Sequence, residues 1–495
     1  MMTALLDRVR GRTFDDFLLA PQLGEIPSRN PDVIDLTSPF TATIPLRRPL
    51  VSANMDTVTR APMAIVMAEE GGIGVIDRGY RPGDVGPQVA EVAAVKRTQH
   101  GIVTDPRGIA ASATVADARE IMRGTGVGTL VVIDEAGRLS GLLTDRDIRF
   151  VAGTVLVGAR MTRRDRLVVH QGPMAWPEAE RVMVEAKVKK LPLVDADDRV
   201  IGLITARDLV KHREHPHATR DAQGRLRVAA AIGATGDFLE RAAELLRVGA
   251  DALVIDIAHG HSRVMERALT AVRARFGDVP LVAGNVATAE GVTFLVDRGA
   301  DAVKVGIGPG GGCTTRLTTN FGVPQAEALV RCHVAAVGRV PLIADGGVAR
   351  DGALVLALLF GGATVMLGSA FAGTAETPGE TVMKAVVMPE SQKIVQVPFK
   401  VFRGMASVGA VRDRLDLEEA DTEELDAMGA EGLEVSVPAR GSARLVIRNM
   451  LKHLCSAISY GGAMSLDGLR QALTADPDRF LIPLSAAART ESFRR

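Results

Sequence analysis

Residues 252–305 read ALVIDIAHGHSRVMERALTAVRARFGDVPLVAGNVATAEGVTFLVDRGADAVKV. Three short apolar runs, at 252–257, 280–283 and 302–305, are separated by longer amphipathic stretches such as 262–276. Short buried strands that alternate with helices are typical of βα units and of a parallel sheet. The pattern therefore predicts an α/β fold for this part of the chain.

Runs of the same kind occur on both sides of this stretch. They lie at residues 226–232, 341–344 and 363–367, with two earlier ones at 49–54 and 74–76. This density of βα units predicts a (β/α)8 TIM barrel, and a doubly wound sheet is the alternative. Several strands end in polar or glycine-rich motifs (DIAHGHS, GNVAT, GIGPGGGC, ADGG, LGS), which is where TIM barrels carry their chemistry.

An internal repeat interrupts the barrel pattern. Residues 129–148 (TLVVIDEAGRLSGLLTDRDI) and 190–209 (KLPLVDADDRVIGLITARDL) share a strand, a turn, a second strand and a Thr-x-x-Asp helix start. The repeat resembles a tandem CBS (Bateman) module, a family that binds adenine or guanine nucleotides. We therefore predict a regulatory module at 96–215 inside a discontinuous barrel domain, 1–95 and 216–495. Its expected nucleotide contacts are Thr144, Asp147, Thr205 and Asp208.

Composition narrows the possible functions. The chain has 495 residues, 59 basic and 59 acidic side chains and 47% hydrophobic residues, so neither a disordered tail protein nor a nucleic-acid-binding protein is expected. Its three cysteines are too few for a disulfide framework and favour a reducing compartment. Without a visible secretory signal or a long apolar run, we expect a cytoplasmic protein with no membrane span.

The segment 305–325, VGIGPGGGCTTRLTTNFGVPQ, contains the strongest chemical signal. Five glycines between Gly306 and Gly312 follow a predicted strand, so backbone amides and carbonyls can approach a ligand closely. Cys313 ends this loop, where amide groups would favour a thiolate. We therefore predict a nucleophilic cysteine that forms a covalent adduct, with a buried structural thiol as the alternative.

Two further strand ends predict a nucleotide site. The motifs 344–347 (ADGG) and 367–369 (LGS) offer amides for a phosphate, and Asp345 beside them would accept ribose hydroxyl groups. Asp256 and Asn285 end neighbouring strands and would hold a second ribose and a carboxamide. Because no Rossmann fingerprint opens a helix, a nicotinamide cofactor would have to lie across the barrel mouth.

Taken together, the motifs resemble the inosine monophosphate dehydrogenase and guanosine monophosphate reductase family along almost the whole chain. The matching motifs are TFDDFLLAP, SANMDTVT, EEGGIGVI, the CBS-like insertion, DIAHGHS, AGNVATAEG, KVGIGPGGGCTTR, GVPQ, ADGG, VMLGSAFAGT and RGMAS. By this resemblance Cys313 attacks purine C2, Thr315 assists it, and Arg414 serves catalysis from the flap.

The resemblance also implies the binding residues. Those expected for the purine mononucleotide are Gly311, Asp345, Gly346, Gly347, Gly368, Ser369, Gly404, Met405 and Glu431. Those expected for NAD, or for NADPH in a reductase, are Asp256, Asn285, Gly306 and Gly308. K⁺ or another monovalent cation would bind carbonyls of Gly308, Gly310 and Cys313, with Glu491 and Ser492 supplied by a neighbouring subunit of a homotetramer or octamer.

The sequence leaves three alternatives open for the reaction. The CBS-like insertion favours a dehydrogenase that converts IMP, NAD and water to XMP and NADH. The alternative is a reductase that converts GMP and NADPH to IMP and ammonia, for which Asn54 is a typical choice. A third alternative is a catalytically impaired regulatory paralogue, because Gly311, Phe402 and Leu415 replace a serine and two tyrosines of the family.

The acidic segment inside 402–440 is expected to form a solvated flap. Residues 412–431 are strongly charged and show no clear apolar face, so little burial would hold them down. An ordinary surface helix is the alternative. Within this segment Arg412 is the other candidate for the role given to Arg414.

Overall fold

The computed structural model describes residues 2–24, 26, 28–98, 106–387, 392–415, 429 and 431–493. The chain forms two compact units. The first comprises Met1–Arg97, His217–Thr219 and Leu226–Arg495, and the second Thr98–Pro216 and Arg220–Arg225. The boundaries expected from the sequence, after residue 95 and before residue 216, lie within a few residues of these.

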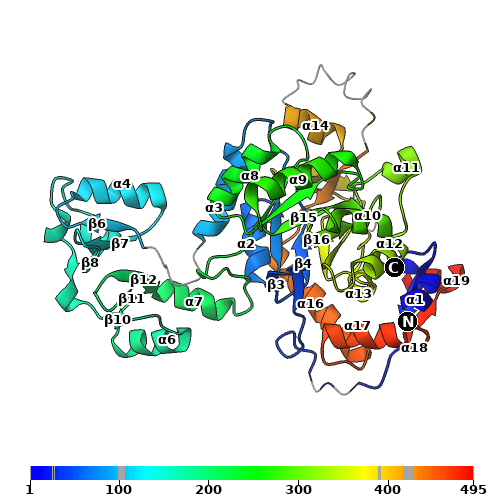
Figure 1. Cartoon of the computed structure of the whole chain (residues 1–495), viewed down its shortest axis with the longest axis horizontal. Coiled ribbons are helices and arrows are strands. Elements are labelled where there is room, and N and C mark those ends of the chain that lie inside the picture. The colour runs from blue at the N-terminus through cyan, green and yellow to red at the C-terminus, as the bar shows by residue number, and fades with distance from the viewer. Residues whose placement is uncertain are drawn as a thin grey trace. The chain divides into compact units, whose positions relative to one another are not determined.

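Eight parallel strands of the first unit close into a barrel, which confirms the TIM-barrel prediction (Figure 1). In spatial order they are β4 (Leu50–Ser52), β5 (Ile73–Ile76), β13 (Ala229–Ile232), β14 (Ala252–Asp256), β15 (Leu281–Val286), β16 (Ala302–Val305), β17 (Leu342–Asp345) and β18 (Thr364–Leu367). Their bounds agree with the predicted runs to within a few residues.

Side chains along these strands alternate between two apolar layers, as the period of a β-strand requires. The inner layer is rich in small residues, including Ala229, Ala231 and Ala252, whereas Ala230 and Leu253 face the surrounding helices. By the same alternation Lys304 of β16 lies on the inner side with Ala302. The barrel interior is therefore a packed core that is narrow at the middle and polar at one mouth.

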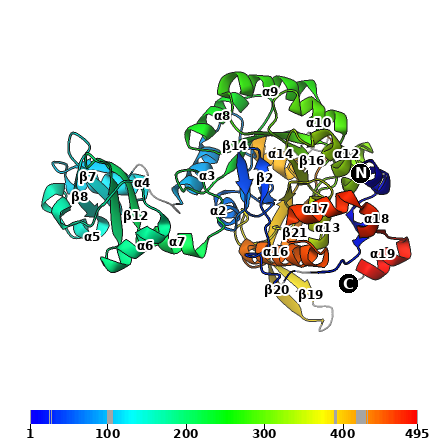
Figure 2. The same cartoon turned by 60° about the horizontal axis from the view of Figure 1, so that its bottom comes forward.

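Helices surround the strands, and Figure 2 shows part of this ring as α8, α9, α10 and α12. The helices around the barrel are α2 (Ala61–Glu69), α3 (Gly86–Arg97), α8 (Phe238–Arg247), α9 (Arg263–Phe276), α10 (Ala289–Val296), α12 (Gln325–Ala336), α13 (Asp351–Leu359) and α16 (Ala443–Tyr460). The hairpin of β2 (Ser38–Thr41) and β3 (Ile44–Leu46) supplies apolar side chains to the inner layer. That hairpin fills the barrel at the end away from the loop glycines.

The two ends of the chain pack together. Strand β1 (Phe17–Leu19) pairs antiparallel with β22 (Leu481–Pro483). The remaining terminal elements are α1 (Met2–Val9), η1 (Phe14–Asp16), α17 (Leu466–Ala475), α18 (Pro477–Phe480) and α19 (Ala486–Phe493). Among the described residues, no helix has both the length and the apolar character that crossing a membrane requires.

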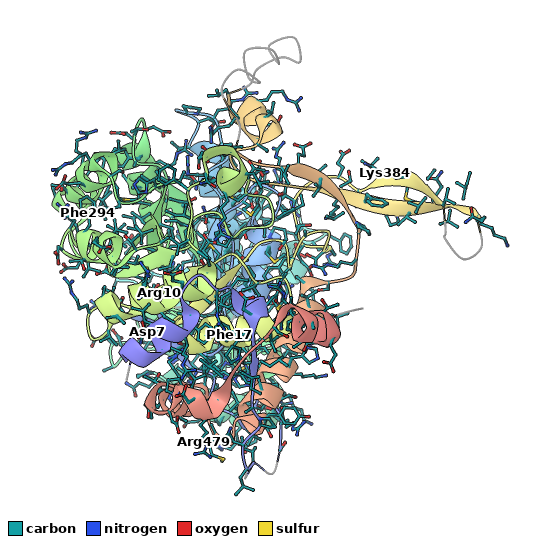
Figure 3. All side chains as sticks on the ribbon, turned by 90° about the vertical axis from the view of Figure 1, so that its right-hand side faces the viewer. Asp7, Arg10, Phe17, Phe294, Lys384 and Arg479 are labelled. Carbon is teal, nitrogen blue, oxygen red and sulfur yellow. The ribbon has the colours of Figure 1, made fainter. Side chains whose placement is uncertain are left out.

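A three-stranded sheet beside the barrel has no counterpart in the sequence predictions. It consists of β19 (Val382–Val387), β20 (Ile394–Arg403) and β21 (Glu434–Pro438). The β19–β20 hairpin projects away from the barrel, as the position of Lys384 shows in Figure 3. The strands on both sides of the expected flap are therefore regular structure.

The expectation of a flap without regular structure is wrong at its first residues. Helix α14 (Val408–Leu415) includes residues 412–415, and Ala410 is the position that it buries. The eight described residues of this helix are too few to give a clear amphipathic signal. Residues 416–428 and 430 of the expected flap lie outside the described part of the chain.

The second unit contains two small sheets with helices packed on them. One sheet has β6 (Gly108–Ala110), β7 (Thr129–Ile133), β8 (Leu139–Thr144) and β9 (Thr162–Arg163), and the other β10 (His170–Gln171), β11 (Lys190–Val194) and β12 (Val200–Thr205). The helices are α4 (Val115–Thr125), α5 (Asp145–Ile148), α6 (Trp176–Glu185) and α7 (Ala206–Glu214). The strand–strand–helix pattern of the sequence repeat is present in both copies.

Candidate active site

A cavity of about 740 Å³ opens at the C-terminal ends of the barrel strands. Its walls come from loops that follow most of the strands and from the α14 region. It is lined by all the catalytic, nucleotide and cofactor residues predicted from the sequence, namely Cys313, Thr315, Arg414, Gly311, Asp345, Gly346, Gly347, Gly368, Ser369, Gly404, Met405, Glu431, Asp256, Asn285, Gly306 and Gly308. Their roles remain predictions, but the fold gathers them at one mouth.

The glycine-rich loop after β16 requires close backbone approach. Gly306 has φ +150°, and a Cβ there would collide with the carbonyl oxygen of Asp345. The loop then pairs with the segment that follows α14. The Leu433 amide donates to the Gly312 carbonyl at 2.9 Å, and the Thr314 amide donates to the Glu431 carbonyl at 3.1 Å. Loop and flap are thereby joined by backbone hydrogen bonds on either side of the cysteine.

Cys313 is the first residue in a chain of two hydrogen bonds. Its Sγ donates to Thr315 Oγ1 at 3.2 Å, and Thr315 Oγ1 donates to Glu431 Oε2 at 2.6 Å. A thiol proton therefore has a route toward a carboxylate. The other two cysteines differ, because burial raises the pKa of Cys332 to about 12 and that of Cys455 to about 11. Only Cys313 combines partial exposure with polar partners, which is the setting of a reactive thiol.

A chain of polar side chains crosses the floor of the cavity. Lys304 Nζ lies 2.9 Å from Asp256 Oδ1 and 2.7 Å from Asp345 Oδ2. Asn54 Nδ2 donates to Asp256 Oδ2 at 2.7 Å, and Asn285 Nδ2 donates to Asp345 Oδ2 at 2.9 Å. Sequence reasoning missed Lys304, although a lysine inside the otherwise apolar run AVKV was a visible signal.

Asn285 also tests whether a nicotinamide cofactor fits. Its side-chain carbonyl oxygen Oδ1 is buried and has no hydrogen-bond partner among the described residues. A buried unpaired acceptor is costly unless a ligand supplies a donor. The amide group of a carboxamide is such a donor, and Asp256 lies across the same cavity. These residues therefore fit the group predicted from the sequence.

The turns that the sequence predicts to bind a phosphate, at 346–347 and 368–369, offer backbone groups and the hydroxyl group of Ser369. Gly346 and Gly347 have φ +88° and +80°, a left-handed conformation that strongly favours glycine. Gly368 and Ser369 face them across the cavity. A Cβ on Gly311 would lie 3.6 Å from Ser369 Oγ, which is ordinary contact distance. The missing serine at this position therefore leaves space that a side chain can fill.

Arg403 anchors the flap to the barrel. Its guanidinium donates to Asp56 Oδ2 at 2.7 Å and to Asp413 Oδ2 at 2.7 Å. Asp56 is itself buried, and its backbone amide approaches Met405 Sδ at 3.3 Å. Arg403 thus fixes α14 through Asp413, and Met405, which is predicted to contact the purine, lies beside the same anchor.

The structure discriminates between the two flap arginines. Arg414 lines the cavity, whereas Arg412 does not line it and pairs with Asp413. Burial and the charge of Arg78 lower the pKa of Arg414, although Asp56 opposes the shift. Arg78, which follows β5 and also lines the cavity, was not anticipated from the sequence. Leu415 lies next to Arg414 in the cavity wall and supplies no hydroxyl group there.

Two groups of predicted residues remain: those of the cation site and those of the second unit. Gly310 and Cys313 are on the cavity loop, and the Gly310 carbonyl accepts the Cys313 amide at 3.0 Å. Glu491 and Ser492 lie on the exposed helix α19 and do not line the cavity of their own chain. In the second unit, the carboxylates of Asp147 and Asp208 accept hydrogen bonds from Thr144 and Thr205 at 2.7 and 2.6 Å. Those threonines cap helices α5 and α7.

A closed parallel barrel with an accessible thiol and glycine-rich turns at its C-terminal mouth is typical of a TIM-barrel enzyme. Comparison with known proteins makes the assignment narrower. The family model "IMP dehydrogenase / GMP reductase domain" matches residues 11–493. The chain belongs to the IMP dehydrogenase / GMP reductase family.

Relatives from both branches resemble the chain along its length. It is 39% identical over 465 residues to inosine-5′-monophosphate dehydrogenase from Aquifex aeolicus, covering 93% of this chain and 91% of the relative. It is 40% identical over 476 residues to the Mycobacterium leprae enzyme, covering 93% and 86%. Among solved structures, a cysteine-to-alanine variant of Trypanosoma brucei GMP reductase with guanosine 5′-monophosphate matches at TM-score 0.81 and 34% identity, covering 97% of each chain.

The anchor formed by Arg403 generates a prediction about the flap. Arg403→Met removes the cation shared by Asp56 and Asp413, so the hold on α14 weakens and buried Asp56 loses its partner. We expect faster amide hydrogen exchange across residues 408–415, measured by mass spectrometry. Arg403→Lys keeps the charge without the bidentate geometry and should be intermediate. Unchanged exchange in Arg403→Met would contradict the anchoring role.

Proposed function

We propose that the chain is an inosine monophosphate dehydrogenase that converts IMP, NAD and water to XMP and NADH. The observation that carries its covalent step is the hydrogen-bonded line from the Cys313 thiol through Thr315 to Glu431, with distances of 3.2 and 2.6 Å, at the mouth of the cavity. The dehydrogenase names of the relatives that match over 93% of the chain support the direction.

The substrate would be held by its phosphate and ribose. Backbone amides of Gly347, Gly368 and Ser369 bind the phosphate, and Asp345 accepts hydroxyl groups of the ribose. Met405 contacts the purine from the flap side. This placement brings the purine C2 atom to the loop that carries Cys313.

Cys313 then forms the covalent bond. Its proton passes to Thr315 as Thr315 donates to Glu431, and the thiolate sulfur adds to C2 of the purine. Asp256, Asn285, Gly306 and Gly308 would hold NAD, which would supply the acceptor for the hydride that leaves C2. The product of this half-reaction is a thioimidate between Cys313 and the purine.

Hydrolysis of the thioimidate needs a group that takes a proton from water. Arg414 is positioned for this step because it lines the cavity and its pKa is lowered by burial and by Arg78. Water attacks C2, the carbon–sulfur bond breaks, and XMP leaves with the Cys313 thiol restored.

GMP reductase activity is the second candidate. The solved GMP reductase structure at TM-score 0.81 favours it, and so does the Thr315–Glu431 pair. That pair could supply a proton to departing ammonia. In this direction the same residues would hold NADPH, which would be the source of the hydride for C2 after ammonia has left, and no water-activating base is needed. Asn54, which holds Asp256, is the choice typical of reductases.

We further infer the cation, the assembly and the regulation. Carbonyl oxygens of Gly308, Gly310 and Cys313 suit K⁺ or another monovalent cation, which would steady the loop. Glu491 and Ser492 would complete that site from a neighbouring subunit of a homotetramer, or of an octamer built from two. The second unit would be a CBS pair that binds a regulatory purine nucleotide near Thr144, Asp147, Thr205 and Asp208. Three free thiols fit a cytoplasmic location.

Two spectrophotometric assays test the function. With IMP and NAD we expect absorbance of NADH to appear, and Cys313→Ala should reduce this rate at least about 1,000-fold because the covalent route is lost. Cys455→Ala, which removes a buried thiol outside the cavity, is the control and should retain turnover. Oxidation of NADPH with GMP instead would assign the reductase reaction. Turnover that survives in Cys313→Ala would exclude the nucleophile.

The two flap arginines give a matched comparison. Arg414→Met should leave the first burst of NADH intact but slow steady-state turnover about 100-fold, because adduct hydrolysis loses its base. Arg412→Met, on the same helix but outside the cavity, should have little effect. Rapid mixing with IMP and NAD separates the two phases. Equal loss in both variants would argue against Arg414 as the base.

The vacant position at Gly311 predicts a gain of affinity. Gly311→Ser restores a hydroxyl group close to Ser369 and should lower the KM for IMP about 5-fold, the value of one added hydrogen bond. Gly311→Ala adds the Cβ without the hydroxyl group and should leave KM near the wild-type value. If both variants bind IMP alike, the hydroxyl group is not directed at the phosphate. If neither the wild type nor Gly311→Ser turns over, the regulatory alternative gains support.

A further inference from the structure

Lys304 occupies an unusual position for a lysine. It lies on β16 between Val303 and Val305, and only 3% of its side chain is exposed. The alternation of β16 turns it into the barrel, where neighbouring strands carry small side chains such as Ala302 and Ala252. Its four-carbon stem therefore fills the barrel interior, and its ammonium group emerges on the floor of the active-site cavity.

The ammonium group binds two carboxylates from different strands. Asp256 ends β14 and Asp345 ends β17, on either side of β15 and β16 in the barrel order. Each also accepts a hydrogen bond from an amide: Asn54 donates to the second oxygen of Asp256, and Asn285 donates to the same oxygen of Asp345 that binds Lys304. Five side chains from five segments thus form one continuous hydrogen-bonded chain across the cavity floor.

The charges of this chain depend on one another. Burial alone would lower the pKa of Lys304, but Asp256 and Asp345 outweigh it and raise the pKa. Burial alone would raise the pKa of Asp256, but Lys304, with Arg78 and the bond from Asn54, lowers it. The ionisable groups that face the cluster are Asp256, Asp345 and, from the end of β5, Arg78. Lys304 and Asp256 therefore each favour the charged form of the other.

The bonds also orient Asp345. Both of its hydrogen bonds, from Lys304 and Asn285, go to Oδ2. Among the described residues no hydrogen bond reaches Oδ1, and that atom is not one of the buried unpaired ones. With Oδ2 fixed, Oδ1 remains available to a hydroxyl group of a ligand in the cavity.

We propose that Lys304 is a positioning residue shared by the two ligand sites of the cavity. It holds the Asp345 side chain oriented for the ribose of the purine nucleotide, and it holds the Asp256 side chain for the cofactor. The identities of these two ligands rest on the proposed function. Loss of this single ammonium group would therefore weaken both sites, although Lys304 itself touches neither ligand.

A purely structural ion pair elsewhere in the chain provides the comparison. Lys96 of α3 is buried and lies 2.7 Å from Asp251, but neither residue lines the cavity. Lys96→Met thus removes a buried, paired lysine from the same barrel without touching the active site. It controls for the general cost of breaking such a pair, which leaves a carboxylate without its cation.

The test is calorimetric titration of the full-length protein with IMP at pH 6, 7 and 8. Wild type should bind with nearly the same affinity at the three pH values. In Lys304→Met the two carboxylates lose the cation that lies between them and only the more distant charge of Arg78 remains, so we expect one carboxylate to take up a proton more readily as the pH falls. We expect binding about 10-fold weaker at pH 7 and weaker again at pH 6, where the protonated carboxyl no longer attracts the ribose as a charged acceptor.

Two further variants separate positioning from folding. Lys304→Arg keeps the positive charge and should recover most of the affinity and the flat pH profile, whereas Lys96→Met should bind like wild type once folding is verified by circular dichroism. Asn54→Ala removes a bond to Asp256 alone. In steady-state assays it should raise the KM for the cofactor but not for IMP, whereas Lys304→Met should raise both.

The outcomes are separable from those of the proposed function. If Lys304→Met binds IMP as wild type does at every pH, the positioning role is wrong, whichever reaction the enzyme catalyses. If wild type binds IMP but turns over neither substrate pair, the dehydrogenase proposal fails, while the pH-dependent loss in Lys304→Met still supports the positioning role. If wild type binds neither IMP nor GMP, both proposals fall.

Discussion

Backbone pairing between the glycine-rich loop and the flap is the constraint on which the reaction centre depends. The hydrogen bonds Leu433–Gly312 and Thr314–Glu431 flank Cys313. They bring a thiol from one part of the chain within two hydrogen bonds of a carboxylate from another. Gly404 completes the contact, because a Cβ there would lie 2.5 Å from the Gly312 carbonyl. Without these close backbone contacts, Thr315 would have no carboxylate to accept its proton.

The composition of the barrel explains how charge can be brought into its mouth. Alanine-rich strands such as β13 leave space in the inner layer, and aromatic residues make up only 3% of the chain. A long lysine side chain can therefore rise through the centre and place its ammonium between two carboxylates. In a barrel packed with larger side chains that route would be closed. The small residues that close the barrel tightly thus also permit its polar floor.

The sequence was sufficient for the features that depend on local pattern. Apolar runs separated by amphipathic stretches located all eight barrel strands, and glycine clusters marked the loops that line the cavity. It was insufficient where a role depends on partners distant in the chain. Arg403 meets Asp56, and Lys304 meets Asp256, only after the barrel has closed. The β19–β20 hairpin was missed because apolar residues such as Met383, Val387 and Ile394 are exposed, so its projecting part gives no one-sided pattern.

The barrel residues do not determine which of the two family reactions an enzyme of this kind catalyses. Both directions need the same phosphate cradle, the same ribose carboxylate and the same sulfur–C2 bond. They differ in what meets the adduct: a dehydrogenase must activate water, whereas a reductase must complete hydride transfer before water arrives. Arg414 beside Arg78 provides a guanidinium whose charge is disfavoured. Leu415 provides no hydroxyl group to assist it. On the proposed mechanism, the direction is decided by how rapidly Arg414 takes a proton from water, a local property that the shared fold leaves free to vary.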